Sequence, residues 1–299
     1  MSRHPILFFA VLFLRFVSGE GAATFTFVNR CGDTIWPGVL SSSGSSPLES
    51  TGFELAAGES RSLYAPSGWS GRFWARTGCV FDVYGNGSCG TGDCGTSRVE
   101  CTGSGAAPPA TLVEFTLGGE KDFYDVSLVD GYNLPVVVEA AGGECPSTGC
   151  AADINRRCPA ELRAGDGAAC RSACDAFGRA EFCCSGEYGN PETCRPSPYA
   201  QMFKAACPRS YSYAFDDATS TFTCAVAAAG GAQAYSITFC PESSASQKSI
   251  KNNTPPKMEE EDESWLASLA IGNANPSRIA RRKEIVYSIT SLLLYFSLF

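Results

Sequence analysis

The sequence predicts a mainly β protein, and two features of its 299 residues carry this prediction. Short apolar runs rich in β-branched and aromatic residues, bounded by Gly, Ser and Pro, recur up to about Val138, at the spacing typical of a β-sandwich or a β-barrel. Sixteen cysteines lie between Cys31 and Cys240, and this even number indicates a framework of disulfides. Because 44% of the residues are hydrophobic, the chain can also bury a core.

The predicted strands begin at residues 23–31, which alternate between apolar and polar side chains. Residues 34–38 continue this pattern, so we expect a hairpin over the two runs. Residues 71–76 predict a further strand, in which Arg72 and Trp74 share one face because side chains alternate along a strand.

Residues 145–207 differ from the rest, since they hold eight cysteines, few β-branched residues and short alanine-rich pieces. Ser197 and Pro198 predict the start of a helix that runs through Cys207, with serine as the cap and proline at the first helical position. Strand-like runs return within residues 222–240. We therefore expect a helical, disulfide-rich insertion between strands.

Residues 1–21 have the layout of a secretory signal peptide, with an apolar run at residues 6–17 and a cleavage site near Gly21. The chain's one histidine, His4, leaves with this peptide. Without imidazole, Ser-His-Asp and Cys-His catalysis are excluded, and the remaining residues argue against a zinc site. We expect no metal and no cofactor, so any hydrolytic chemistry must use carboxylates.

The composition changes after the last cysteine. Residues 242–271 predict a disordered linker, with an acidic run at residues 259–263. Residues 272–299 end in fifteen uncharged residues, fewer than the roughly 20 that a spanning helix needs, and a basic spacer precedes them. This order is typical of a glycolipid-anchor signal, with Gly272 or Asn273 as the attachment residue, and a short membrane span or an unprocessed tail is the alternative.

The charge and the compartment limit the class of partner. The formal net charge of −8 repels polyanions, so we expect neutral or cationic ligands and no nucleic acid, although simple solubility explains the same charge equally well. The signal peptide and the paired cysteines predict secretion into an oxidising compartment. Sequons at Asn86 and Asn252 predict glycosylation, and we expect a monomer.

Three carboxylates are the candidate site. Residues 123–129 alternate, which puts Asp125 on the face opposite to the apolar side chains. Asp130 opens a turn directly after this strand, and Glu114 lies in a neighbouring short strand. We therefore expect the three acids to converge on one surface, with Arg72 as a candidate partner.

Residues 85–94, Gly-Asn-Gly-Ser-Cys-Gly-Thr-Gly-Asp-Cys, resemble the thaumatin-like, or osmotin, family of plant defence proteins. The resemblance covers residues 23–240 and aligns all sixteen cysteines in order. It implies one domain with a cleft between its β-sandwich and its disulfide-rich helical region. The parts of this domain at residues 22–241 are a central β-sandwich, a disulfide-rich helical region at residues 145–207 and a small disulfide loop region at residues 77–102.

Spacing alone leaves about two million cysteine pairings open. The resemblance implies one of these pairings, which consists of eight disulfides and joins the first strand to the last. These pairs are Cys31 with Cys240, Cys79 with Cys89, Cys94 with Cys101, Cys145 with Cys224, Cys150 with Cys207, Cys158 with Cys170, Cys174 with Cys183, and Cys184 with Cys194.

Family members that act on fungi have an acidic cleft of one arginine and four carboxylates. By position these correspond to Arg72, Glu114, Asp125, Asp130 and Asp217, with the adjacent Asp216 as the alternative to the last. Some members bind or cleave β-1,3-glucans, and others permeabilise fungal membranes. The resemblance thus implies a secreted or cell-surface plant defence protein that binds cell-wall β-1,3-glucan through Arg72 and Asp217. Weak endo-β-1,3-glucanase activity would use Glu114, Asp125 and Asp130, and the alternative is a non-catalytic membrane-permeabilising or carbohydrate-sensing protein.

Each candidate residue also has a structural explanation. Arg72 and the acids would form an ion-pair network that joins two parts of the protein. Asp93 is better explained as a loop residue whose carboxylate accepts hydrogen bonds from nearby backbone amides. Aromatic side chains near the acids would face either a sugar or, as is usual in strands, the core: Phe115, Phe123, Tyr124 and Tyr132.

Overall fold

The computed structural model describes residues 21–118, 120–141, 145–226 and 233–242. Several sequence-based predictions fall outside these residues. They are the signal peptide up to residue 20, the linker beyond Glu242, the sequon at Asn252, and the anchor site at Gly272 or Asn273.

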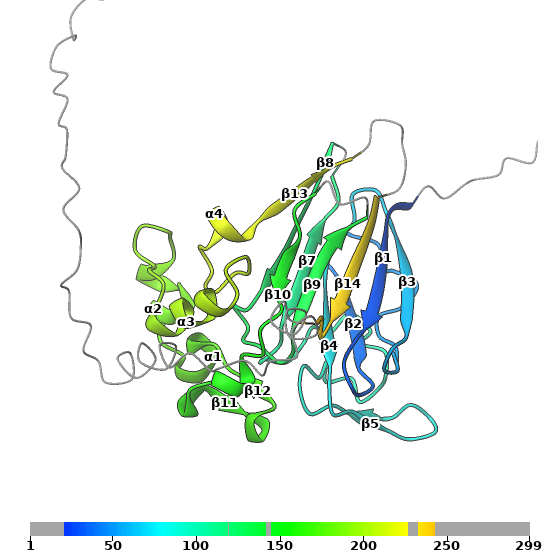
Figure 1. Cartoon of the computed structure of the whole chain (residues 1–299), viewed down its shortest axis with the longest axis horizontal. Coiled ribbons are helices and arrows are strands. Elements are labelled where there is room, and N and C mark those ends of the chain that lie inside the picture. The colour runs from blue at the N-terminus through cyan, green and yellow to red at the C-terminus, as the bar shows by residue number, and fades with distance from the viewer. Residues whose placement is uncertain (1–20, 119, 142–144, 227–232, 243–299) are drawn as a thin grey trace, which may run out of the picture. The chain divides into compact units, whose positions relative to one another are not determined.

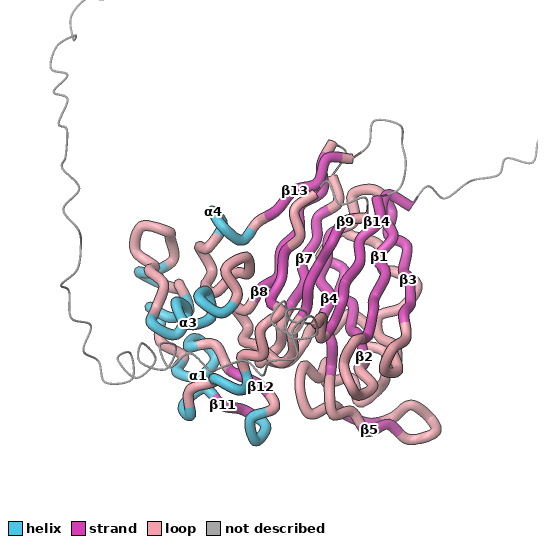
Figure 2. Tube along the Cα trace, viewed as in Figure 1, coloured by secondary structure: helices cyan, strands magenta, loops and turns pink. Residues whose placement is uncertain are grey.

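Two five-stranded β-sheets pack against each other in the described part of the chain (Figures 1 and 2). The order of the first is β10 (Thr148–Cys150), β9 (Val136–Ala140), β14 (Gln233–Phe239), β1 (Gly21–Asn29), β3 (Ser60–Pro66). The order of the second is β13 (Phe222–Ala225), β8 (Lys121–Ser127), β7 (Leu112–Thr116), β4 (Ser70–Arg76), β2 (Trp36–Ser41). Within both sheets neighbouring strands are antiparallel, except β1 and β14, which are parallel.

Aromatic rings fill the space between the sheets. The ring of Phe25 on β1 lies 4.8 Å from that of Phe73 on β4 and 4.7 Å from that of Phe115 on β7. All three side chains are buried. Because side chains alternate along a strand, the register that buries these rings turns the residues between them to the outer faces of the sheets.

The predicted hairpin over residues 23–38 is wrong, because β1 and β2 lie in different sheets. The cause lies at Asn29, whose buried side chain donates to the carbonyl oxygens of Asp33 and Leu55 and accepts from the Cys31 amide, at distances of 2.8 to 2.9 Å. These bonds hold a turn that sends the chain across the sandwich to the opposite sheet.

The helices lie in the chain between β10 and β13, and Figure 2 shows them gathered on one side of the sheets. The α-helices of the described residues are α1 (Ala173–Phe177), α2 (Ala180–Cys183), α3 (Pro198–Ala206) and α4 (Asp217–Ser220). The predicted start of α3 is confirmed, since Ser197 Oγ accepts a hydrogen bond from the Ala200 amide at 3.1 Å. None of the helices in the described ranges is long and apolar enough to cross a membrane.

Eight disulfides hold this fold, and no cysteine of the described residues is free. The pairs are those that the family resemblance implies. The bond between Cys31 and Cys240 joins the ends of the paired strands β1 and β14 over a separation of 209 residues. Closing a loop of that length stabilises the folded state by roughly 5 kcal/mol in the chain-entropy model.

The small loop region contains the short hairpin of β5 (Val80–Phe81) and β6 (Gly87–Ser88). Asp93 organises the loop that follows, because its carboxylate accepts hydrogen bonds from the amides of Cys89 at 2.7 Å and Gly95 at 2.6 Å. The predicted loop role of Asp93 is confirmed.

Arg76 attaches this loop region to the sandwich. Its guanidinium donates to the carbonyl oxygens of Trp36 at 3.0 Å and Val99 at 2.6 Å. Burial lowers the pKa of this side chain to about 10, since the charged form loses its hydration. Arg76 shares a strand face with Arg72 but is fully buried, so it serves the packing of the loop region.

Candidate functional site

Arg72, Glu114 and Asp125 stand side by side on the neighbouring strands β4, β7 and β8. In the register of the sheet, Arg72 pairs with Glu114, and Glu114 pairs with Asp125. The adjacent residues Phe115 and Tyr124 point into the core, so the three charged side chains project from the outer face. The predicted orientation of Asp125, away from the apolar face, is confirmed.

Asp217 reaches this face from the segment that follows the helical region. The Leu128 amide donates to the Tyr211 carbonyl at 2.8 Å, and the Tyr211 amide donates to the Val126 carbonyl at 2.9 Å, which fixes this segment beside the end of β8. The Tyr211 hydroxyl then donates to Asp217 Oδ1 at 2.7 Å. Asp217 is therefore held at the rim of the sheet by a tyrosine that is itself tied to β8.

Asp130 enters from the turn after β8. The next residue, Gly131, has a φ of +89°, and a Cβ at this position would lie 2.8 Å from the carbonyl oxygen of Cys170. Only glycine accommodates this close approach together with a positive φ. The turn predicted at Asp130 is present, and it brings the carboxylate back towards the other acids.

These residues line one open groove of about 370 Å³. Its walls contain all five residues that the sequence analysis singled out, Arg72, Glu114, Asp125, Asp130 and Asp217. Sequence reasoning missed the remaining lining residues, which are Leu112, Ser127, Val129, Tyr211 and Ala214. Tyr211 carries no sequence signal, since it belongs to no motif and reaches the groove only through its pairing with β8.

Burial and like charges favour the protonated form of two carboxyls. Arg72 Nη2 lies 3.4 Å from Glu114 Oε1, an attraction that opposes the effect of burial, and the pKa of Glu114 is nevertheless raised. Burial and then the charge of Glu114 raise the pKa of Asp125 to about 8. At neutral pH Asp125 therefore carries a proton.

Arg72 and the acids do not form an ion-pair network in which every buried polar atom has a partner. Within the described part of the chain, Asp125 Oδ1 is buried and has no hydrogen-bond partner. A buried polar atom in this state costs free energy unless a ligand or water satisfies it. The groove therefore contains a carboxyl with an oxygen that no group of the described residues satisfies.

Asp216 has a different role from its neighbour Asp217. Its Oδ2 atom lies 3.0 Å from Lys204 Nζ and accepts a hydrogen bond from the Ser212 amide at 3.0 Å. This carboxylate fixes the loop before α4. Of the two adjacent acids, only Asp217 lines the groove.

The aromatic candidates divide between the core and the surface. Phe115, Tyr124 and Tyr132 are buried, whereas the Phe123 side chain is 40% exposed. Phe123 precedes Asp125 by two residues on β8, so its ring lies on the same outer face as the acids.

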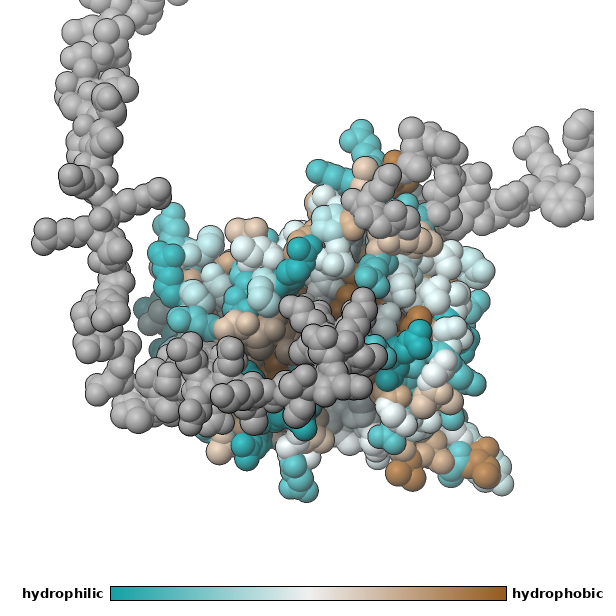
Figure 3. Space-filling view, in the orientation of Figure 1, coloured by the Kyte–Doolittle hydropathy of each residue, from teal (hydrophilic) through white to brown (hydrophobic). Residues whose placement is uncertain are grey.

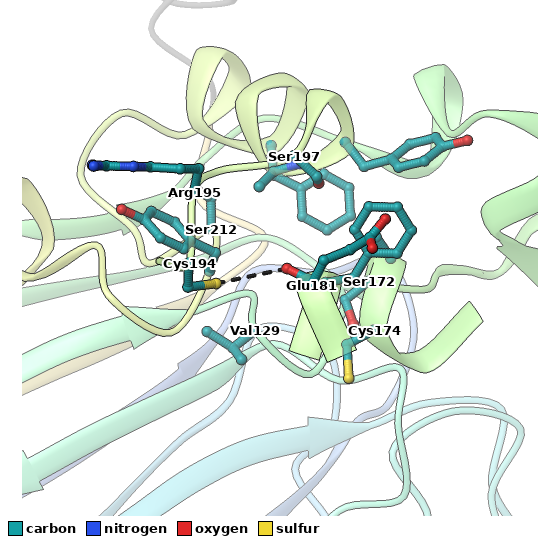
Figure 4. A pocket seen from close by; sticks show the side chains of 14 residues that line it. Val129, Ser172, Cys174, Glu181, Cys194, Arg195, Ser197 and Ser212 are labelled. Carbon is teal, nitrogen blue, oxygen red and sulfur yellow. Dashed lines mark hydrogen bonds between the residues drawn. The ribbon is translucent and has the colours of Figure 1, made fainter. Parts of the chain in front are cut away.

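A separate small pocket lies among the helices, between α2 and α3 (Figure 4). Its lining includes Glu181, Cys194 and Ser212, and its volume is about 20 Å³. This space holds about one water molecule. Across the described ranges, no group of three or more His, Cys, Asp and Glu side chains is arranged to hold a metal ion.

The model of the thaumatin family matches residues 29–241. The chain belongs to the thaumatin family. It is 59% identical over 246 residues to "Thaumatin-like protein 1" of Arabidopsis thaliana, covering 79% of this chain and 91% of that protein. It is 57% identical over 228 residues to "Pathogenesis-related thaumatin-like protein 3.5" of Cryptomeria japonica, covering 75% of this chain and 92% of that protein. The resemblance seen in residues 85–94 is thus confirmed, as is the mainly β, thaumatin-like fold.

One of the relatives is a considerably longer protein than this chain. The chain is 45% identical over 271 residues to the "PR5-like receptor kinase" of Arabidopsis thaliana, covering 86% of this chain and 40% of that protein.

Among solved structures, the thaumatin-like xylanase inhibitor TLXI is 25% identical, with a TM-score of 0.42 over 73% of this chain and 99% of that chain. A laminaripentaose-producing β-1,3-glucanase in complex with laminaritetraose is 14% identical, with a TM-score of 0.45 over 72% of this chain and 97% of that chain.

The raised pKa of Asp125 predicts how stability depends on pH. Because the pKa rises from 3.8 to about 8 on folding, ionisation disfavours the folded state, and this loss grows between about pH 4 and pH 8. We expect Asp125→Asn to match the wild type at pH 4 and to exceed its free energy of unfolding at pH 8 by up to about 5 kcal/mol, since each pKa unit corresponds to about 1.36 kcal/mol. Urea unfolding with the disulfides intact measures both values.

Glu139→Gln is the matched control, since Glu139 is an exposed carboxylate on β9 of the other sheet. It should show no gain over the wild type at pH 8 comparable to that of Asp125→Asn. A constant difference between Asp125→Asn and the wild type from pH 4 to pH 8 would contradict a protonated Asp125.

Proposed function

We propose that this chain binds β-1,3-glucan, a neutral cell-wall polysaccharide, in the acidic groove as a plant defence protein. The observation that carries the proposal is the convergence of Arg72 and four carboxylates on one open groove. Sugar hydroxyls donate to carboxylates and accept from a guanidinium, so a groove with both groups binds a neutral sugar from several sides.

The charge of the chain supports a neutral ligand. Polyanions are repelled by a net charge of −8, and the groove itself concentrates acids around a single arginine. Asp125, whose Oδ1 atom has no hydrogen-bond partner among the described residues, lines the groove that a sugar would enter.

Hydrolysis of the bound glucan is a second candidate function, and the state of Asp125 favours it. A glycosidase needs one protonated carboxyl as general acid and one ionised carboxyl as nucleophile or base. Asp125, with a pKa of about 8, fits the acid. Arg72 opposes the rise in the pKa of Glu114 and stabilises its ionised form, so Glu114 fits the nucleophile.

Asp130 and Asp217 complete the site in this proposal by binding sugar hydroxyls at the two ends of the acid pair. Asp130 is the alternative to Asp125 as the partner of Glu114 in catalysis. A non-catalytic membrane-permeabilising or carbohydrate-sensing protein would use the same groove for binding alone.

Glucan binding and cleavage are tested together with laminarin. We expect calorimetry to detect binding and a reducing-end assay to detect slow cleavage by the wild type. Because Asp125→Asn and Glu114→Gln remove the acid and the nucleophile, each should lower the cleavage rate by about 100-fold or more and weaken binding less. Glu139→Gln, on the other sheet, should change neither property.

The outcomes separate the two functions. Binding by the wild type without any release of reducing ends would reject the hydrolase and keep the glucan-binding protein. If laminarin fails to bind the wild type, the proposed ligand is wrong.

The proposal also places the protein outside the cell, as a monomer. The signal peptide directs it through the endoplasmic reticulum, and a glycolipid attached at Gly272 or Asn273 holds it at the plasma membrane. Treatment of intact cells with phosphoinositide-specific phospholipase C should then release the protein into the medium. A spanning or untethered protein would keep its distribution, and a known glycolipid-anchored protein on the same cells is the positive control.

A further inference from the structure

A second depression, of about 240 Å³, adjoins the acidic groove on the same face of the sheet. It shares Glu114 and Asp125 with the groove. Its other lining residues are mostly hydroxylated or aromatic: Ser42, Ser70, Gly71, Phe115, Thr116 and Phe123. The acid pair therefore stands between two depressions, with open space on both sides.

Three of these residues form a row parallel to the charged one. Ser70 pairs with Thr116, and Thr116 pairs with Phe123, across β4, β7 and β8. Each lies two residues along its strand from Arg72, Glu114 or Asp125, so the two rows share one face and are about 6.6 to 6.8 Å apart. The hydroxyls of Ser70 and Thr116 are 3.1 Å apart and form a polar pair beside the ring.

Phe123 is the apolar member of this row. Its side chain is 40% exposed, and Lys121 Nζ lies 5.4 Å from the ring centroid. An exposed ring beside two hydroxyls matches the two surfaces of a sugar, whose ring has an apolar face and a polar edge.

We propose that this second depression is a sugar subsite that continues the groove, in which Phe123 stacks on a glucose ring and Ser70 and Thr116 bind its hydroxyls. The inference rests on the proposed glucan binding and specifies its occupant, the next residues of the same chain. The glucan then passes over Glu114 and Asp125 with sugars on both sides, so the site recognises the interior of the polymer.

The length dependence of binding tests this subsite. With β-1,3-linked glucose oligosaccharides from the disaccharide to the hexasaccharide, the wild type should bind the longer ones more tightly. Phe123→Ala should weaken binding of the longer oligosaccharides by about tenfold and leave the shortest unchanged, because only the longer ones reach the ring. Phe123→Trp should restore the length dependence.

Phe177→Ala is the matched control, since Phe177 on α1 is also 40% exposed and does not line either depression. Length-dependent binding that is identical in the wild type and Phe123→Ala overturns the subsite and leaves the glucan-binding function intact. Absence of binding for every oligosaccharide and for laminarin overturns both.

A different observation carries a second inference, at the tip of the hairpin of β5 and β6. Val80, Val83 and Tyr84 are 78%, 94% and 81% exposed. Figure 1 shows this loop projecting from the sheets, and Figure 3 shows hydrophobic surface at the same place. Exposed apolar side chains on one rigid tip are unfavourable in water unless something covers them.

The tip is rigid because Asp82 and a disulfide hold it. The Asp82 carboxylate accepts hydrogen bonds from the amides of Tyr84 at 2.8 Å and Asn86 at 2.9 Å, and from Asn86 Nδ2 at 3.2 Å. The bond between Cys79 and Cys89 closes the hairpin. Asn86 is exposed in this turn and begins the acceptor tripeptide that ends at Ser88.

The geometry points to an N-linked glycan on Asn86 whose first sugars cover Tyr84. Glycosylation replaces one of the two protons on Asn86 Nδ2, and the other can still donate to Asp82. Tyr84 precedes Asn86 by two residues on the same tight turn and its ring is exposed, so the attached sugar can cover it. This inference rests on passage through the endoplasmic reticulum and is independent of the glucan.

The protein secreted by plant or insect cells tests the glycan. Peptide mass spectrometry should find Asn86 modified, and Ser88→Ala should abolish the modification while keeping Asn86 in place. Enzymatic removal of the glycan should lower Tm by about 2 to 4 °C in the wild type, because Tyr84 loses its cover.

Tyr84→Ala should carry the glycan and show no such loss of Tm on its removal. An unmodified Asn86 in the secreted protein overturns the inference. An equal loss of Tm in the wild type and in Tyr84→Ala overturns the contact between the sugar and the ring.

Discussion

The aromatic core between the two sheets is the constraint on which the groove depends. The register of β4, β7 and β8 buries three rings together, those of Phe73, Phe115 and Tyr124. That register places Arg72 and Asp125 on either side of Glu114 on the outer face. A shift of one residue in any of the three strands would bury a charge and expose a ring, so the packing of the core specifies the site.

Much of this arrangement could be predicted from the sequence, because it follows from local periodicity. The alternation around Asp125 fixed its face, and the same alternation placed Phe123 beside it. The predicted hairpin after β1 failed because alternation reports which face of a strand is buried and does not identify the strand that pairs with it. Asn29 redirects the chain through contacts that no local pattern reveals.

The residues that complete the groove were the hardest to predict. Tyr211 reaches the acids through backbone hydrogen bonds to β8, a contact between segments more than 80 residues apart in the chain. The position of Asp217 rested on the family resemblance, and the structure distinguishes it from Asp216 because Lys204 binds the latter. Long-range placement of this kind depends on the disulfides and on tertiary packing, which periodicity does not encode.

The groove combines a fixed floor with a separate wall. Its floor, on β4, β7 and β8, cannot change without disturbing the core, whereas Tyr211, Ala214 and Asp217 come from a segment that two backbone hydrogen bonds attach to β8. Sequence variation in that segment alters the shape of the wall and preserves the charged row beneath it. A single scaffold of this type can therefore acquire new ligand preferences through changes in one loop.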